Sequence, residues 1–160
     1  DELARFPGVA AVLGKNALAP TREEARLKGI ADTGFLVAFA NRGDTHHAWA
    51  LEVAHQISAP LLTCEAVLSE TAFHLQSSRL VLAMVRDGLV IPAFDCREHL
   101  LHLSSLADRY HDRHPDFADL CLVRMSELYP KHSVITIDRG DFTVFRRNKR
   151  EAIPIVCPPA

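Results

Sequence analysis

The chain has 160 residues and a formal net charge of -2, and 48% of its residues are hydrophobic. This length and apolar content suit one globular domain with a single core and exclude a disordered chain. A protein that binds nucleic acid through charge alone is usually basic, so RNA contact here would need a local basic patch or a bound metal ion. No apolar run reaches the roughly 18 residues of a membrane-spanning helix, so we expect no membrane partner.

The four cysteines of the chain stand singly and form no CxxC pair. They are Cys64, Cys96, Cys121 and Cys157. Zinc fingers and disulfide frameworks need closer or patterned spacing. We therefore expect buried thiols in a reducing compartment, which predicts a cytoplasmic protein.

Residues 1–28 differ in composition from the rest of the chain. They hold the run FPGVAAVLG, with its proline and glycines, and a charge cluster in which Thr21 and Glu24 match a capping box. We interpret residues 1–28 as an N-terminal extension, partly helical, and residues 29–160 as one domain.

From residue 29 onward, short apolar runs alternate with helical patterns. The expected order is a strand at 29–32, helices at 34–40 and 45–57, a strand at 60–64, helices at 65–76 and 77–88, a strand at 89–94, helices at 97–113 and 116–129, and strands at 133–138 and 153–156. Pro154 has no amide proton, which suits the edge strand of a sheet. This alternation predicts an α/β fold with a parallel sheet covered by helices on both faces.

The reactive residues that follow the strand ends are carboxylates. In parallel sheets, ligands bind beyond the carboxyl ends of the strands. Asp32 follows the first strand, and Asp138 and Asp141 follow the fourth. Glu70 lies on the helix after the second strand, and Asp119 opens the helix before the fourth. The sequence contains no nucleophile-elbow serine, no Gly-rich phosphate loop and no HExxH motif.

Each acid also has a purely structural interpretation. Asp32 suits the cap of the next helix, and Asp119 suits the third position of a cap that begins at Asp116. Asp138 suits a turn, and Glu70 suits a solvated helix face. These interpretations weaken when taken together, because the fold would bring the acids to one end of the sheet.

Carboxylates that converge in this way need a compensating charge. Two unit charges about 4 Å apart repel by about 4 kcal/mol at an effective dielectric constant near 20. Either some of the acids stay protonated or a divalent cation lies between them. Hard oxygen ligands favour Mg²⁺ or Mn²⁺, and such ions support phosphodiester hydrolysis.

Four runs of the sequence resemble PIN domains, notably the VapC-type toxins, in the order and spacing of that family. They are IADTGFLVAFANRGDTHHAWA, PLLTCEAVLSETAFHL, FADLCLVRMSELY and SVITIDRGDF, within a resemblance that covers residues 29–156. The resemblance implies a three-layer α/β/α sandwich whose central sheet is mainly parallel, with about five strands. The sequence departs from the family in its short first strand and in the extension at residues 1–28.

The resemblance also implies an activity, which is cleavage of RNA that depends on Mg²⁺ or Mn²⁺. Its four acids map onto Asp32, Glu70, Asp119 and Asp138, which would hold metal and position the attacking water. Other positions that match the family are a fifth acid and two hydroxyl side chains, namely Asp141, Thr33 and Thr136.

A basic segment follows the last of these acids. This segment holds four basic residues, namely Arg139, Arg146, Arg147 and Lys149. It is interpreted either as a solvated loop or as a patch that binds RNA phosphates beside the metal site.

The resemblance implies an RNA substrate, a small antitoxin protein as partner, and a homodimer. The leading hypothesis is a metal-dependent endoribonuclease that acts as the toxin of a toxin–antitoxin pair. Two alternatives stay open, which are a PIN-like module that binds RNA or protein without catalysis and a PIN nuclease of RNA processing without a toxin role.

Overall fold

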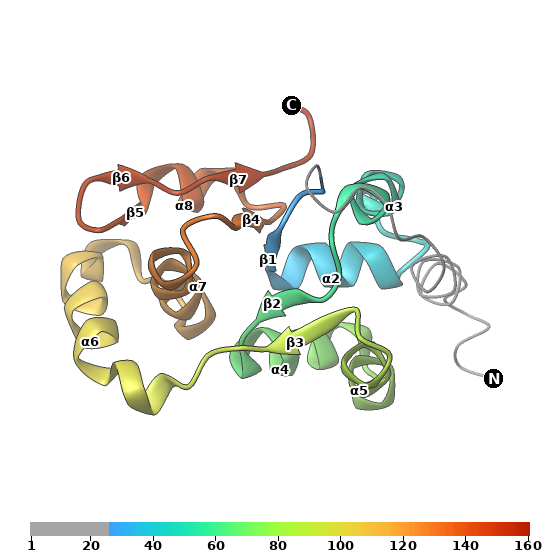
Figure 1. The fold of residues 1–160 in the computed structure, drawn as a ribbon, viewed down its shortest axis with the longest axis horizontal. Coiled ribbons are helices and arrows are strands. Elements are labelled where there is room, and N and C mark those ends of the chain that lie inside the picture. The colour runs from blue at the N-terminus through green and yellow to red at the C-terminus, as the bar shows by residue number, and fades with distance from the viewer. Residues whose placement is uncertain (1–25) are drawn as a thin grey trace.

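A computed structural model describes residues 26–160 of the chain (Figure 1). At its centre is a five-stranded sheet in the order β3-β2-β1-β4-β7, and every neighbouring pair is parallel. The strands are β1 (Gly29–Ala31), β2 (Leu61–Thr63), β3 (Val90–Pro92), β4 (Ser133–Ile135) and β7 (Ile155–Val156). The prediction of a parallel α/β fold of about five strands is confirmed.

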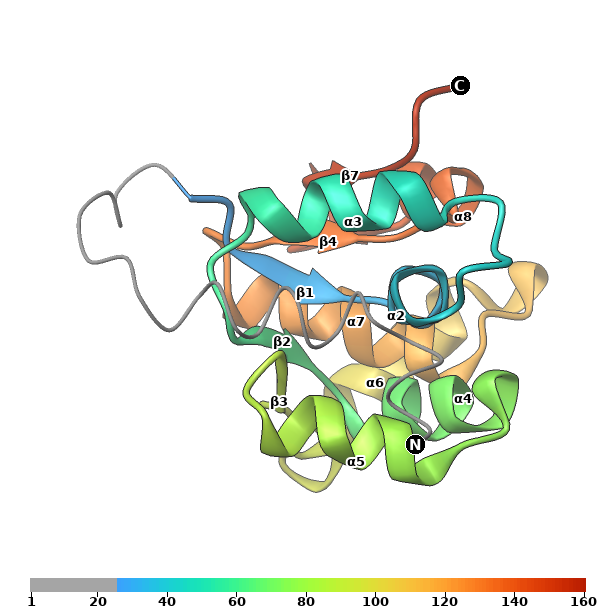
Figure 2. The same cartoon turned by 90° about the vertical axis from the view of Figure 1, so that its right-hand side faces the viewer.

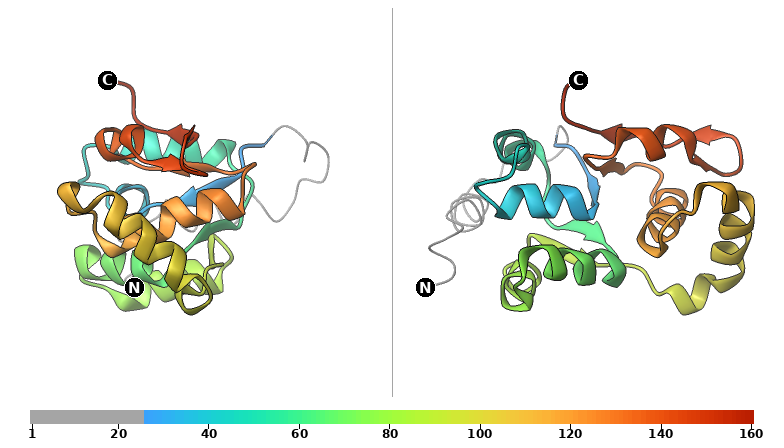
Figure 3. Two further views of the ribbon diagram at one scale, coloured as in Figure 1. Left: turned by 90° about the vertical axis from the view of Figure 1, so that its left-hand side faces the viewer. Right: turned by 180° about the vertical axis from the view of Figure 1, so that it is seen from behind.

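Helices cover both faces of this sheet and make it the middle layer of an α/β/α sandwich. The helices are α2 (Thr33–Ala40), α3 (His47–Gln56), α4 (Glu65–Leu75), α5 (Ser78–Arg86), α6 (Leu100–Arg109), α7 (Phe117–Leu128) and α8 (Arg139–Val144). Helices α3 and α5 lie on one side of the sheet, as Figures 1 and 2 show. Helices α6 and α7 lie on the other side, in yellow and orange in the left panel of Figure 3.

The three central strands, β2, β1 and β4, are largely buried. Ile30, Leu61, Val134 and Ile135 are each 0% exposed. Burial on both faces is what gives parallel strands a continuous apolar sequence in place of an alternating one.

The strand order places a topological switch point between β1 and β4. The chain runs outward from β1 to β2 and β3, and then returns to form β4 on the other side of β1. Ala31 and Ile135 pair at the carboxyl ends of these two strands. Connections leave such a point in opposite directions, which opens the crevice where α/β proteins bind ligands.

The helix expected over 97–113 is wrong as a single element. The segment folds as a 3-10 turn at Cys96–His99, the helix α6, and a second 3-10 turn at His111–Arg113. Asp95 starts the first turn by accepting a hydrogen bond from the Arg97 amide at 2.9 Å. His114 ends the second turn in the left-handed region, at φ 49°.

The expected strand at 133–138 is shorter than predicted, since β4 ends at Ile135 and the chain turns into α8. After α8, the strands β5 (Arg146–Arg147) and β6 (Glu151–Ala152) form an antiparallel hairpin that was not predicted. The last strand, β7, is an edge strand, as expected, but Pro154 precedes it and does not lie within it. The Pro154 carbonyl oxygen accepts a hydrogen bond from the Val134 amide.

Leu27 already belongs to the folded domain. It pairs with Ile57 in an isolated parallel bridge, and its amide donates to the carbonyl oxygen of Gln56 at 3.1 Å. Residues 1–25 of the predicted extension, together with the start of its predicted helix, lie outside the described residues. From residue 26 onward, no helix is both long and apolar enough to cross a bilayer.

All four cysteines are free thiols. Cys64 and Cys121 are buried, as expected, whereas Cys96 and Cys157 are partly exposed, so the prediction of buried thiols holds for only half of them.

Candidate functional site

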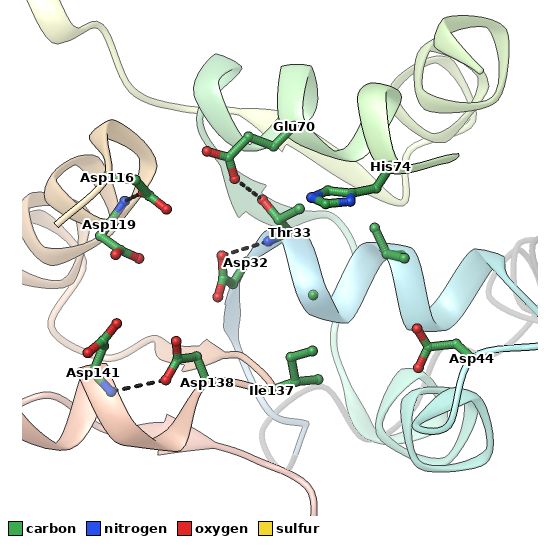
Figure 4. A pocket seen from close by; sticks show the side chains of 12 residues that line it. Asp32, Thr33, Asp44, Glu70, His74, Asp116, Asp119, Ile137, Asp138 and Asp141 are labelled. Carbon is green, nitrogen blue, oxygen red and sulfur yellow. Dashed lines mark hydrogen bonds between the residues drawn. The ribbon is translucent and has the colours of Figure 1, made fainter. Parts of the chain in front are cut away.

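One pocket collects the acids that the sequence singles out. We call it the acidic pocket, and Figure 4 shows its lining side chains. It has a volume of about 340 Å³ and is lined by Asp32, Thr33, Gly34, Val37, Asp44, Glu70, His74, Asp116, Asp119, Ile137, Asp138 and Asp141. All five predicted acids and Thr33 are among these residues. No lysine or arginine of the described part of the chain lines it.

Asp32 lies at the switch point, directly after β1. Its Oδ1 accepts a hydrogen bond from the Thr33 amide at 2.7 Å and so caps α2. Its Oδ2 accepts a second one from the Thr136 hydroxyl at 2.6 Å. The same hydroxyl oxygen accepts the Asp138 amide at 2.9 Å. Thr136, which is fully buried, therefore ties the acid after β1 to the acid after β4.

Glu70 reaches the pocket from α4. Its Oε2 accepts a hydrogen bond from the Thr33 hydroxyl at 2.8 Å. The two predicted hydroxyl residues, Thr33 and Thr136, thus hold one carboxylate each in place, and both lie next to the predicted acids.

The structural and functional interpretations of the aspartates prove to be compatible. Asp116 caps α7 by accepting the Asp119 amide at 2.8 Å, and Asp138 caps α8 by accepting the Asp141 amide at 3.0 Å. Asp32 caps α2 in the same manner. Each cap uses one carboxylate oxygen, and all three capping aspartates also line the acidic pocket.

Crowding and burial perturb the acids of the pocket. Burial, helped by repulsion from Asp116 and Asp32, raises the pKa of Asp119 to about 8. Burial also raises the pKa of Asp32 to about 6, although its hydrogen bonds from Thr136 and Thr33 act in the opposite direction. Asp141 has a raised pKa as well, first from burial and then from repulsion by Asp138. The pocket therefore has a deficit of positive charge.

The chemistry of these donors fits a hard divalent cation. Carboxylate oxygens are the ligands that Mg²⁺ and Mn²⁺ prefer, and a cation would relieve the repulsion that raises these pKa values. Across residues 26–160, however, no three His, Cys, Asp or Glu side chains lie close enough together to hold one ion as they stand. The pocket supplies the charge and the donor type, and its side chains would have to rotate inward to form a coordination shell.

Three ionisable lining residues, Asp44, His74 and Asp116, were not predicted as site residues. His74 lies one turn after Glu70 on α4, and Asp116 lies one turn before Asp119. Residues three or four apart share a helix face, so both were within reach of a sequence argument. Asp44 lies in the loop between α2 and α3, and no sequence signal indicates its position.

The predicted basic residues do not line the acidic pocket. Arg146 donates through Nη1 to three backbone carbonyls at the end of α8, and Arg147 donates to two carbonyls of the α7 helix and the turn after it. Arg139 donates to the Pro158 carbonyl at 3.0 Å. Lys149 is exposed at the turn of the β5–β6 hairpin.

Compared with known proteins, the chain matches no protein-family model and no curated protein sequence. Fold and site therefore define the class on their own. The protein is a parallel α/β sandwich with a carboxylate-lined pocket at its topological switch point.

Proposed function

We propose that this protein is a metal-dependent endoribonuclease that hydrolyses phosphodiester bonds in the acidic pocket. The observation that supports this most is the convergence of acids from five separate segments of the fold on one crevice. Seven of the lining residues are Asp or Glu, and the pKa values of Asp32 and Asp119 are raised. A structural role in capping explains single aspartates but not their common destination.

In this proposal, the carboxylates that would hold Mg²⁺ or Mn²⁺ are Asp32, Asp119 and Asp138, with Asp141 as a further ligand. When bound, the cation supplies charge for the phosphate oxygens and acidity for a water. Glu70, held by Thr33, orients the attacking water. Thr33 and Thr136 hold the carboxylates of Glu70 and Asp32 in place, so the inward rotation that cation binding requires starts from two restrained acids.

The proposed biological role is that of a toxin in a toxin–antitoxin pair, acting in the cytoplasm as a homodimer. The sequence resemblance supports this role. The pocket also suits inhibition by a small antitoxin protein, because a basic side chain inserted among its carboxylates would form charge-assisted hydrogen bonds. Lys149 and Arg139 are the exposed members of the predicted RNA-binding set, and exchange of Lys149 for Glu is expected to weaken RNA binding.

A second candidate function is a PIN-like module that binds RNA or protein without catalysis. Such a module has no need for a pocket of uncompensated carboxylates, because these would repel a polyanion such as RNA and weaken its binding. The retention of every expected acid favours the nuclease. RNA binding with no turnover in any divalent cation would favour the module.

Cleavage of a mixed RNA substrate by the full chain tests the proposal. We expect cleavage with Mn²⁺ or Mg²⁺ and none with EDTA. Asp32→Asn and Asp119→Asn should each reduce the rate by about 100-fold or more, since each removes a charge that acts on the transition state. The matched control is Asp108→Asn, an exposed aspartate of α6 outside the pocket, which should cut at the wild-type rate. Equal cleavage by all four proteins, or cleavage in EDTA, would refute the proposal.

A further inference from the structure

The acidic pocket has a second half that the proposed chemistry does not use. Besides Asp116, the proposal leaves without a role the lining residues Gly34, Val37, Asp44, His74 and Ile137. We call these five residues the distal half of the pocket. In Figure 4, Asp44 and Asp119 lie at opposite sides of the pocket. The pocket therefore extends well beyond the candidate metal ligands.

Helix α2 and Ile137 give the distal half an apolar surface. Gly34 and Val37 are three residues apart and share one face of α2. A Cβ atom at Gly34 would overlap with Cγ1 of Ile137, so the absence of a side chain at Gly34 lets Ile137 pack directly on the helix. Ile137 is still 38% exposed. An apolar surface that stays accessible within a pocket suits the flat face of a ligand.

An aromatic side chain adds to this surface. His74 lies one turn after Glu70 on α4 and is exposed. Of the residues that the structure describes, it is the only aromatic one that lines the acidic pocket. The ring of Phe73 packs against the imidazole in an edge-to-face arrangement, with ring centroids 5.6 Å apart. Proteins that recognise single-stranded RNA stack its unpaired bases on side chains of this kind, histidine included.

Asp44 supplies hydrogen-bond acceptors to the distal half. It lies in the loop between α2 and α3, where its Oδ1 accepts the His46 amide at 2.8 Å. Its own amide donates to the Asn41 carbonyl at 3.0 Å, so the loop holds this residue through side chain and backbone. An ionised carboxylate has about four lone-pair sites and no donor, so Asp44 can accept further hydrogen bonds from a ligand.

We propose that the distal half is a subsite for an unpaired guanine base, which stacks on His74 and donates its N1 and N2 hydrogens to Asp44. Guanine alone among the neutral RNA bases presents two adjacent donors on its base-pairing edge, and these match the two oxygens of a carboxylate. Adenine and cytosine present an amino group beside an acceptor nitrogen, which a carboxylate repels. Uracil presents one donor between two carbonyl oxygens, which are repelled in the same way.

The subsite would select the position at which RNA is cut. Both halves belong to one pocket, so a guanine held by Asp44 and His74 brings a nearby phosphate of the same strand to the acids. The strand must be single, because the edge that Asp44 reads is engaged in duplex RNA. This consequence rests on the proposed nuclease function, whereas binding of the base does not.

Titration of the isotope-labelled full chain with guanosine in EDTA, followed through its amide signals by NMR, tests the subsite. Guanosine carries no phosphate, so the acids of the pocket do not repel it. Inosine is the matched ligand, because it lacks only the N2 amino group. We expect both nucleosides to shift the amide signals of pocket residues. Guanosine should bind about 10-fold more tightly than inosine, because inosine loses one hydrogen bond to a charged group. Adenosine should also bind more weakly than guanosine.

Two variants separate the hydrogen bonds from the stacking. Asp44→Asn keeps an oxygen for the His46 amide but replaces an acceptor with a donor, so guanosine should lose its advantage over inosine. His74→Ala should weaken both nucleosides equally, by about 5-fold or more, because it removes the stacking surface. The control is again Asp108→Asn, which lies outside the pocket and should keep both affinities.

The wild-type titrations decide the matter even if a variant is unstable. Equal affinities for guanosine and inosine, no binding of guanosine, or shifts confined to other parts of the chain would overturn the subsite. In the RNA assay with Mn²⁺, a single-stranded oligonucleotide with one guanine should be cut faster than the same strand with inosine in its place. Equal rates would overturn the selection of the cutting position. If no RNA is cut at all, the nuclease proposal fails while the nucleoside titrations still test the subsite.

Discussion

Replacing Asp32 by Asn should stabilise the metal-free protein, and the gain should grow with pH. A pKa shift of one unit corresponds to about 1.4 kcal/mol. The pKa of Asp32 rises from 3.8 to about 6, so ionising this side chain in the folded protein costs about 3 kcal/mol more than in the unfolded chain. The sign follows from proton binding. Between these two pKa values the folded state holds the proton and the unfolded state has lost it, so the free energy of unfolding falls as pH rises.

Asparagine removes this cost while it keeps most of the local contacts. Its side-chain oxygen can still cap α2 at the Thr33 amide, and its amide group can donate to the Thr136 hydroxyl oxygen. From the two pKa values, the advantage of Asp32→Asn grows from about 1 kcal/mol near pH 4.5 to about 3 kcal/mol near pH 8, with a constant offset for altered hydrogen bonds.

Urea unfolding of both proteins in EDTA, followed by circular dichroism, measures this difference. Comparing the two proteins at each pH cancels the titration of other groups, such as His132, whose pKa is lowered by burial and by Lys28. A difference in the free energy of unfolding that stays constant over this pH range would refute the reasoning. Mn²⁺ should then raise the stability of the wild type more than that of Asp32→Asn, because binding to the folded state adds to stability.

Two further substitutions test the packing that supports the site. Gly29→Ala places a methyl group against Cδ1 of the buried Ile135, closer than van der Waals contact allows, so urea unfolding should show a loss of about 1–3 kcal/mol. An unchanged midpoint would contradict this packing. Glu127→Ala removes the partner of Arg124 at 2.7 Å and of the Asn148 amide at 2.8 Å. It should cost about 2–3 kcal/mol and speed hydrogen exchange in the β5–β6 hairpin, and unchanged exchange there would show that Glu127 does not hold the hairpin.

The strands and most helices could be predicted from local pattern. Ile30 and Val134 lie in short apolar runs that only a sheet buried on both faces accommodates, and both are 0% exposed. The long helix at 97–113 could not be predicted correctly, because its apolar residues continue the helical period. In the structure a 3-10 turn that Asp95 caps precedes α6, and a second one that ends at the left-handed His114 follows it.

The acids of the pocket were predictable for the same reason, since capping aspartates and strand ends leave local signals. Asp44 left none, because only the loop after α2 brings it to the pocket. The arginines Arg146 and Arg147 were open to two interpretations, and neither included the backbone carbonyls that they contact in the structure. A sequence does not reveal which distant carbonyl will lie within reach of a long side chain.

The sequence by itself determined the alternation of strands and helices and the position of each acid along the chain. Only the tertiary structure decided that Thr136 joins the acids after β1 and β4, and that the Thr33 hydroxyl reaches Glu70. The physical reason is that local pattern reflects interactions between residues near one another in the chain. Contacts across the sheet and between helices depend on the order in which the strands assemble, and the β1–β4 switch point exists only once that order is set.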